Sequence, residues 1–509
     1  MSSLLPHAFT RLGERFDRRY PQSILSGLAA CLWFSVFASA AHDLWAACLV
    51  FGFLTILVLL LLVGHFRTRR SIQLPFIGPV LLVLGAFVVS INYSYDFVNS
   101  RFECWVWFFS FISFYLIINS AQTQAQLNSF FVLSSYVLVP LAIYCLVIWI
   151  TGQTTDVHAT LINSIILCGF SLYWVFILWA KRNQKGFSGT SLFAVFIILL
   201  LGRSFWAPIS LALGLMYYYK DVIKTTYSKR RYVFLFISFL SLLACCAVIF
   251  FKFTLSKRYG YPDSNRLTWW IAAARMAAQH PLTGVGLGGY GTAYPYFHVG
   301  RGLKSLYAHD FPLQLLSETG ILGVMSLLWL SLVIVRRIRL FEDSPDLSSS
   351  TRRIFIATLI TVGCYSLVHI NMEYFLNKMM FLFILTPLIE PHEKDLKIQP
   401  GRWTAIGALV MLLLIPSWIV PWAASTHFIE GMRHEEAHLW PLARAAYQKA
   451  IELDGTYGDA YAGLARTYGE AYREKGSATD LAEQRAYMLE ALRWKKSVHF
   501  LAELEHPRQ

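Results

Sequence analysis

The sequence predicts an all-α membrane protein that crosses the bilayer many times. Of its 509 residues, 56% are hydrophobic and 15% are charged, whereas about a quarter of the residues in a soluble domain are charged. The mean hydropathy is +0.49. Apolar runs of roughly 17 to 25 residues, the length at which a helix crosses about 30 Å of hydrocarbon, recur from Ser23 to Trp422. These observations exclude a soluble multidomain protein.

We expect about 12 or 13 transmembrane helices in the region 23–424. The apolar runs alternate with short polar loops, apart from one long polar segment that follows the ninth run. The predicted spans are 23–41, 44–63, 74–92, 104–120, 129–151, 159–180, 189–201, 205–219, 231–252, a tenth that ends near 335, 353–370, 376–389 and 403–422.

The net charge of +14 reflects membrane topology, and we expect no nucleic-acid partner. Lys and Arg concentrate in alternate short loops, which is the positive-inside pattern. The basic clusters are 11–19, 67–70, 181–185, 220–231, 336–353 and 394–402. We therefore place these loops and the N-terminal residues 1–22 in the cytoplasm, and the long segment 253–313 on the outer side.

The polar stretch 253–323 carries most of the candidate chemistry. Arg266 and Arg275 precede the sequences HPLTGVGLGGYG (280–291) and AHDFPLQLLSETGILG (308–323). Because arginine forks match phosphate oxygens, a cationic outer loop beside the bilayer suits a membrane-anchored diphosphate. The glycines lack the Lys-Ser/Thr of a P-loop and do not indicate nucleotide binding. The eight cysteines lie in or beside apolar segments and show no disulfide or metal-binding spacing.

Three further residues are candidate site residues, each with a structural alternative. Arg203, between two apolar runs, either faces a polar cavity or is an ordinary interfacial cation. His309 is placed to exchange a proton with a hydroxyl near neutral pH, although a lone histidine is more often structural. Glu373, in the short outer loop 371–378, either orients His309 or an acceptor, or is simply solvated.

After Pro421 the composition changes to that of a soluble helical domain, which we place at 425–509. The stretch 442–476 carries small residues at helix-crossing positions and resembles a tetratricopeptide repeat, with flanking helices near 425–437 and 478–495. The odd number of spans places this tail on the outer side. With fewer than three full repeats, it is expected to pack on the membrane domain or on a partner.

Four motifs follow one another along the membrane part of the chain. They are Gly202-Arg203-Ser204, Arg266 with Trp269 or Trp270, His280-Pro281-Leu282 with Gly284, Gly286 and Gly288, and His309-Asp310 with Glu318, Gly320 and Gly323. With these motifs in this order, residues 20–390 resemble the O-antigen ligase and polymerase superfamily, the integral-membrane glycosyltransferases of bacterial surface polysaccharide assembly. The family usually has Asn after the histidine, where this chain has Asp310, and about twelve spans.

The resemblance implies a GT-C-like domain in the bacterial inner membrane with a periplasmic active site. There a glycan is transferred from undecaprenyl diphosphate to an acceptor hydroxyl, without a nucleotide sugar, a metal or another cofactor. In this scheme Arg203 and Arg266 bind the diphosphate, with Arg275 in reserve. His309 is the general base, a role worth ~10²–10⁴ in rate, and Glu373 supports it.

The acceptor stays open at this stage. Ligation to lipid A-core is the leading interpretation, and polymerisation of lipid-linked repeat units or O-glycosylation of protein are the nearest alternatives. A transporter or flippase, with Arg203 and the basic loop as a substrate vestibule, is the alternative from another class. The tail either presents an acceptor or docks another assembly protein.

Overall fold

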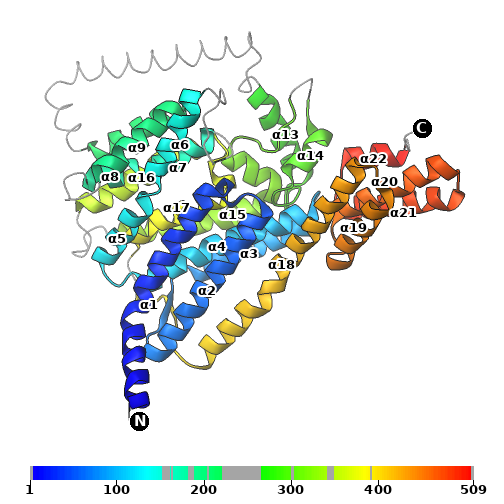
Figure 1. The fold of residues 1–509 in the computed structure, drawn as a ribbon. Coiled ribbons are helices and arrows are strands. Elements are labelled where there is room, and N and C mark those ends of the chain that lie inside the picture. Colours follow the sequence, from blue (N-terminus) through cyan, green and yellow to red (C-terminus); the bar gives the residue numbers. More distant parts are fainter. Residues whose placement is uncertain are drawn as a thin grey trace, which may run out of the picture.

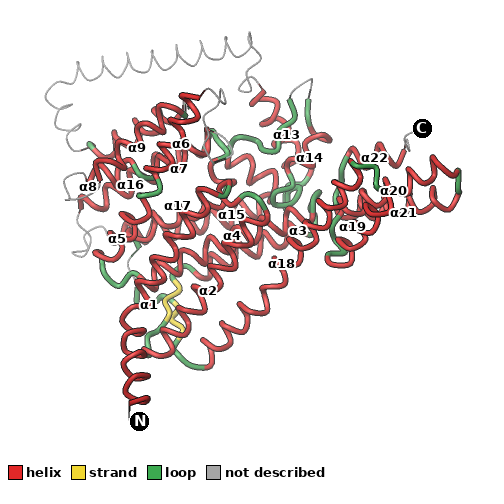
Figure 2. Tube along the Cα trace, in the orientation of Figure 1, coloured by secondary structure: helices red, strands yellow, loops and turns green. Residues whose placement is uncertain are grey.

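The computed structural model describes residues 4–151, 161, 164–181, 188–202, 204, 206–220, 265–299, 303–340, 349–389 and 392–505. These residues form helices and one two-stranded ribbon (Figure 2), so the predicted all-α fold is confirmed. The first ten helices are α1 (Leu4–Phe37), α2 (Leu44–Thr68), α3 (Ile77–Ile91), α4 (Phe97–Ser120), α5 (Gln124–Ser135), α6 (Leu138–Thr151), α7 (Ser164–Leu172), α8 (Val175–Lys181), α9 (Ser188–Leu201) and α10 (Trp206–Tyr218).

Two short helices, α13 (Arg266–Gln279) and α14 (Tyr290–Phe297), precede the long helix α15 (Phe311–Leu340). The chain then forms α16 (Ser349–Ser366), the 3-10 turn η3 (Asn371–Glu373) and α17 (Phe375–Leu385). The C-terminal helices are α18 (Arg402–Glu436), α19 (Trp440–Leu453), α20 (Gly458–Lys475), α21 (Ala478–Trp494) and α22 (Val498–Glu505).

Every predicted span coincides with a described helix or helix pair, except 231–252, which lies outside the described residues. Among the described residues, six helical stretches are long and apolar enough to cross a membrane, with α5 and α6 counted as one stretch, and four further apolar stretches are shorter, with α7 and α8 counted as one. Several apolar helices agree with a multi-pass membrane protein, and the number of crossings stays a prediction. The predicted spans 129–151 and 159–180 are each broken into two helices, at Tyr136–Val137 and at Tyr173–Trp174.

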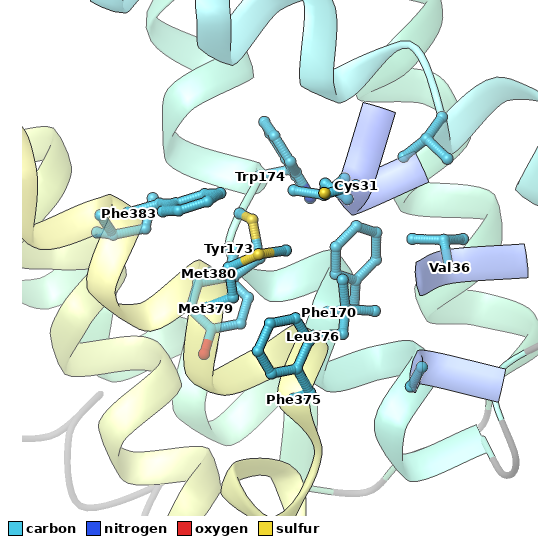
Figure 3. Close-up of a cluster of buried hydrophobic side chains, with 14 of the residues drawn as sticks. Cys31, Val36, Phe170, Tyr173, Trp174, Phe375, Leu376, Met379, Met380 and Phe383 are labelled. Atoms are coloured by element: carbon cyan, nitrogen blue, oxygen red, sulfur yellow. The ribbon is translucent and has the colours of Figure 1, made fainter. Parts of the chain in front are cut away.

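The second of these breaks places two aromatic side chains in the core of the membrane domain. The turn between α7 and α8 directs Tyr173 and Trp174 inward, where both are fully buried. The Tyr173 hydroxyl donates to the Asn377 carbonyl of α17 at 2.9 Å. Figure 3 shows these side chains packed among residues of α17 and α1. Burial of two large aromatic rings stabilises the packing of this turn against its neighbours.

Segments predicted to be cytoplasmic meet at one end of the molecule. Strand β1 (Ile72–Leu74) pairs antiparallel with β2 (Leu396–Ile398), which joins the loops after α2 and α17. The Arg67 guanidinium lies 3.0 Å from Asp17. Arg337, at the end of α15, pairs with Asp395 at 2.5 Å. Four of the predicted basic clusters therefore lie on the same side, as the positive-inside pattern requires.

The tail continues directly from the membrane domain. The elements predicted separately at 403–422 and 425–437 form one helix, α18, which contains Pro416 and Pro421. Helices α19 and α20 form a hairpin over the repeat-like stretch 442–476, and α21 matches the predicted flanking helix. The buried Tyr447 ring lies so close to Gly431 and Gly463 that a Cβ at either position would fall 2.5 Å from it. These small residues let the helices cross; the tetratricopeptide character of the tail stays a prediction.

The tail contacts the start of α4, at the end of the molecule that carries α13 and α14 (Figure 1). The Lys496 N–H donates to the Tyr95 carbonyl at 2.8 Å, and the Phe97 and Trp494 rings pack edge to face with centroids 5.3 Å apart. Arg101 forms an ion pair with Asp454. The expected packing of the tail on the membrane domain is therefore seen in these contacts.

Candidate functional site

The glycine-rich loop 280–291 is joined to the start of α15 by backbone hydrogen bonds. The N–H groups of Val285 and Gly286 donate to the Ser317 and Glu318 carbonyls at 2.9 and 3.0 Å. The Glu318 carboxylate accepts from the Tyr290 N–H at 3.2 Å. These N–H groups of the loop therefore bond to the protein itself. The glycine-rich motif is explained by this contact with α15, and a nucleotide phosphate is not needed to account for it.

Gly284 and Gly320 make this close approach possible. Their φ angles are +65° and +61°, and Gly320 has ψ −162°, a region that is essentially restricted to glycine. A Cβ on Gly284 would lie 2.2 Å from the Glu318 carbonyl carbon, and a Cβ on Gly320 would lie 2.4 Å from the Leu282 carbonyl carbon. The two backbones interlock only because both positions lack a side chain.

We expect Gly320→Ala to lower the melting temperature of the purified protein by several degrees. The backbone strain costs on the order of 1–3 kcal/mol, and the clash with the Leu282 backbone adds to it. Thermal unfolding in detergent measures the change. Gly363→Ala is the matched control, because a Cβ there meets nothing within 4 Å and α16 is helical at that position. Equal melting temperatures for the two variants would contradict the interlock.

His309 lies in the turn that leads into α15, with φ +57°. Its half-buried ring stacks on Trp269 of α13, with centroids 4.6 Å apart and an interplanar angle of 24°. Trp269 is itself fixed, because its Nε1–H donates to the Leu303 carbonyl at 2.9 Å. A non-glycine residue in the left-handed region carries strain that tends to persist at functional sites.

Asp310 stands where the related family usually has Asn, and its position suits either residue. Its carboxylate accepts from the Leu313 N–H at 2.8 Å and so caps α15, a role that Asp and Asn fill equally well. Burial raises the pKa of the Asp310 carboxyl, and the Leu313 N–H and the Arg266 charge oppose that shift. The cap fixes the turn that carries His309.

Arg266, the first residue of α13, binds the segment that follows α16. Its Nη1 donates to the Val368 carbonyl, and its Nη2 lies 3.3 Å from Nδ1 of the buried His369. The His369 ring packs against Tyr365, with centroids 4.5 Å apart. The Tyr365 hydroxyl in turn lies 3.1 Å from the Ser204 hydroxyl. We call Arg266, His369, Tyr365 and Ser204 the Arg266 cluster.

The structure brings the Arg266 cluster close to His309. Arg266 and Trp269 are three residues apart on α13, so their side chains lie within about 60° of each other on one helix face. Trp269 carries the His309 ring, and the Arg266 charge acts on Asp310. Arg203 lies outside the described residues, although its neighbour Ser204 belongs to the cluster. The motifs that contain Ser204, Arg266 and His309 are far apart in the sequence and lie close together in the structure.

Arg275 lies apart from this group. Nine residues separate it from Arg266 on α13, which corresponds to about 13 Å along the axis and to opposite helix faces. Its side chain is exposed. A substrate that Arg275 contacts must therefore extend over the outer face of α13.

Glu373 lies at a cavity of about 390 Å³ between the membrane domain and the tail. Its backbone carbonyl accepts from the Lys378 ammonium at 3.1 Å, and the same ammonium lies 3.0 Å from the Glu103 carboxylate. The cavity also exposes Tyr307, whose hydroxyl lies 3.2 Å from Nε2 of His42. Glu373 is thus grouped with Glu103 and Tyr307.

The ionisation of Glu373 predicts a pH dependence of stability. Burial raises the pKa of its carboxyl to about 7, against the opposing charge of Lys378. A carboxyl whose pKa is higher in the folded state favours folding when protonated, so this contribution is lost as pH rises through about 7. We expect Glu373→Gln to melt higher than the wild type at pH 8, on the order of a few degrees, and to match it near pH 5. A difference independent of pH would contradict this assignment.

Sequence reasoning missed the partners of these residues. His369 contacts Arg266 and Tyr365 packs on His369, and Glu103 forms an ion pair with the buried Lys378 beside Glu373. One signal was present: Lys378 falls inside the predicted span 376–389, and Glu103 immediately precedes the span 104–120. Ionisable residues in apolar spans are functional candidates by default.

One family model matches the central part of the chain. The family model described as O-antigen ligase matches residues 163–330, which confirms the predicted resemblance to the O-antigen ligase superfamily. The match covers Arg203, Arg266, Arg275 and His309, whereas Glu373 and the tail lie beyond it. It supports an O-antigen ligase or polymerase function in a multi-pass bacterial membrane protein. Comparison with curated proteins gives no match.

Proposed function

From the match to the O-antigen ligase family, we propose that this protein transfers a glycan from undecaprenyl diphosphate to a hydroxyl of lipid A-core. The reaction takes place at the periplasmic face of the bacterial inner membrane. The observation that carries the proposal is the convergence of Arg266 with the Trp269–His309 stack at the start of α15. In this arrangement Arg266 supplies a cation that can bind a diphosphate, and His309 supplies a base that can accept a proton from a hydroxyl.

In this proposal His309 removes the proton from the acceptor hydroxyl as its oxygen attacks the anomeric carbon of the donor sugar. The bond from that carbon to the diphosphate oxygen breaks, and undecaprenyl diphosphate leaves with the electron pair. Arg266 and Arg203 stabilise the charge that develops on the leaving group, and such electrostatic stabilisation usually contributes more to catalysis than any other single effect. A diphosphate is already a good leaving group, so a dedicated acid is not required.

Glu373 and Arg275 take secondary roles in the proposal. Glu373 lies at the cavity with Glu103 and Tyr307, which favours contact with the acceptor over contact with the diphosphate. Arg275 is the reserve diphosphate contact, reached by a donor that extends over the exposed face of α13. No metal or other cofactor takes part in the proposed step.

The test offers purified protein a lipid-linked oligosaccharide on undecaprenyl diphosphate together with three acceptors: lipid A-core, further donor and a serine-containing peptide. Product on lipid A-core supports the proposal. Longer glycans that remain on undecaprenyl diphosphate would identify a polymerase instead, and glycopeptide would identify a protein transferase. Donor movement across liposomes without any product would identify a flippase.

A further inference from the structure

The cavity at Glu373 is built by both the membrane domain and the tail. It has a volume of about 390 Å³, within the roughly 300–1,000 Å³ of ligand-binding pockets. Tyr457, Asp459 and Lys495 of the tail line it together with the starts of α2 and α4. Asp96 lies between the two parts, 3.4 Å from the Lys495 ammonium. A ligand in this cavity therefore touches the tail.

The charges that line the cavity disfavour an anion. Both basic side chains are already paired with carboxylates, Arg101 with Asp454 and Lys495 with Asp459. Among the acidic side chains Glu103 is paired with Lys378, but the acidic side chains that line the cavity outnumber the basic ones and offer acceptor oxygens to hydroxyl donors. The acidic lining residues are Asp96, Glu103, Glu373 and Asp459, and the basic ones are Arg101 and Lys495. A diphosphate is better matched by the Arg266 cluster.

Aromatic rings form much of the rest of the lining. A sugar ring combines an apolar face, which packs on aromatic rings, with hydroxyls that donate to carboxylates. The aromatic residues are Phe51, Phe102, Trp105, Tyr307, Trp418 and Tyr457. This combination suits a neutral, hydroxyl-rich ligand.

Two chain segments connect the cavity to the proposed reaction centre. Tyr307 lines the cavity, and His309, two residues later, stacks on Trp269. Glu373 lines the cavity, and His369, four residues earlier, contacts Arg266. A ligand bound in the cavity therefore lies beside the segments that carry the base and the diphosphate-binding cluster.

We infer that this cavity binds the neutral sugar of the acceptor whose hydroxyl is presented to His309, and that the tail is part of the acceptor site. The inference rests on the proposed transfer reaction. It separates the two substrates by charge: the anionic donor headgroup lies at the Arg266 cluster, and the uncharged acceptor sugar lies in the acidic, aromatic cavity. The tail then helps to select the acceptor.

Direct binding tests the inference without relying on activity. The full-length His309→Ala protein is titrated calorimetrically with neutral oligosaccharides of hexose, N-acetylhexosamine and deoxyhexose, each paired with a phosphorylated counterpart. We expect at least one neutral probe to bind and its phosphorylated counterpart to bind at least about tenfold more weakly, because the lining carboxylates repel the phosphate. Binding of no neutral probe, or tighter binding of the phosphorylated one, would overturn the inference.

Two variants locate the binding site. Leu306→Trp adds bulk at a cavity residue that is 62% exposed, and Asp459→Asn removes a tail carboxylate while Lys495 keeps Asp96 as a partner. Each should weaken binding about tenfold. Leu442→Trp, at a 52% exposed leucine of α19, is the control. Unchanged affinity in both cavity variants would place the sugar elsewhere.

Kinetics distinguish a failure of the inference from a failure of the proposed function. In the transfer assay, Leu306→Trp should raise KM for the acceptor about tenfold and leave KM for the donor unchanged. Normal transfer with an unchanged acceptor KM would overturn the inference and leave the function intact. If a neutral probe binds but no acceptor receives a glycan, the proposed transfer function is refuted, whereas the cavity is supported as a sugar-binding site.

Discussion

The His309→Ala variant is expected to lose transfer by a factor of about 10²–10⁴ while remaining folded in the membrane. In the proposed reaction the acceptor hydroxyl needs a base that takes up its proton. His309 is that base, and its imidazole is held beside the Arg266 cluster by stacking on Trp269. The assay follows the rate of product formation from undecaprenyl-diphosphate oligosaccharide under single-turnover conditions, so that product release does not mask the chemical step.

The backbone at His309 calls for a second variant. Its φ of +57° is strained for alanine, so His309→Ala alone mixes loss of the base with a change in the turn. Asparagine tolerates this region, and His309→Asn should therefore melt like the wild type and still be inactive. The exposed His298 of the same outer segment provides the control, and His298→Ala should retain transfer. Substantial activity in His309→Asn would refute the general-base role.

Local features of the site could be predicted from the sequence because they depend on residues close together in the chain. The position of α15 follows from its apolar run, and Arg266 and His309 were both identified in the polar stretch 253–323. The Asp310 cap is equally local, since it bonds Leu313 three residues later. Apolar runs likewise located the membrane helices.

Long-range pairings could not be predicted in this way. Lys378 and Glu103 are 275 positions apart in the sequence, and each alone reads as a charge near the end of an apolar run. Asp96 and Lys495, which join the tail to α4, are likewise far apart in the sequence. Helix packing decides which charges meet, and a hydropathy pattern contains no information on that choice. The cavity at Glu373 is a product of these pairings and was therefore missed.

Substitution of Arg266 is the second change with a large expected effect. Arg266→Ala should reduce transfer by about 10²–10³, the loss typical of removing one group that stabilises developing negative charge. Because the planar fork binds phosphate oxygens at two points, Arg266→Lys should recover only a small part of the activity. The exposed Arg339, at the other end of α15, serves as the control, and Arg339→Ala should retain the wild-type rate.

Arg266 also bonds Val368 and His369, so a purely structural role has to be separated from diphosphate binding. A structural role predicts a lower melting temperature and equal losses with every ligand. Diphosphate binding predicts that a water-soluble prenyl diphosphate protects the wild type against thermal unfolding, whereas Arg266→Lys loses that protection at an unchanged melting temperature without ligand. Full protection of the lysine variant would assign Arg266 to the fold, because a bound diphosphate would then not depend on its guanidinium.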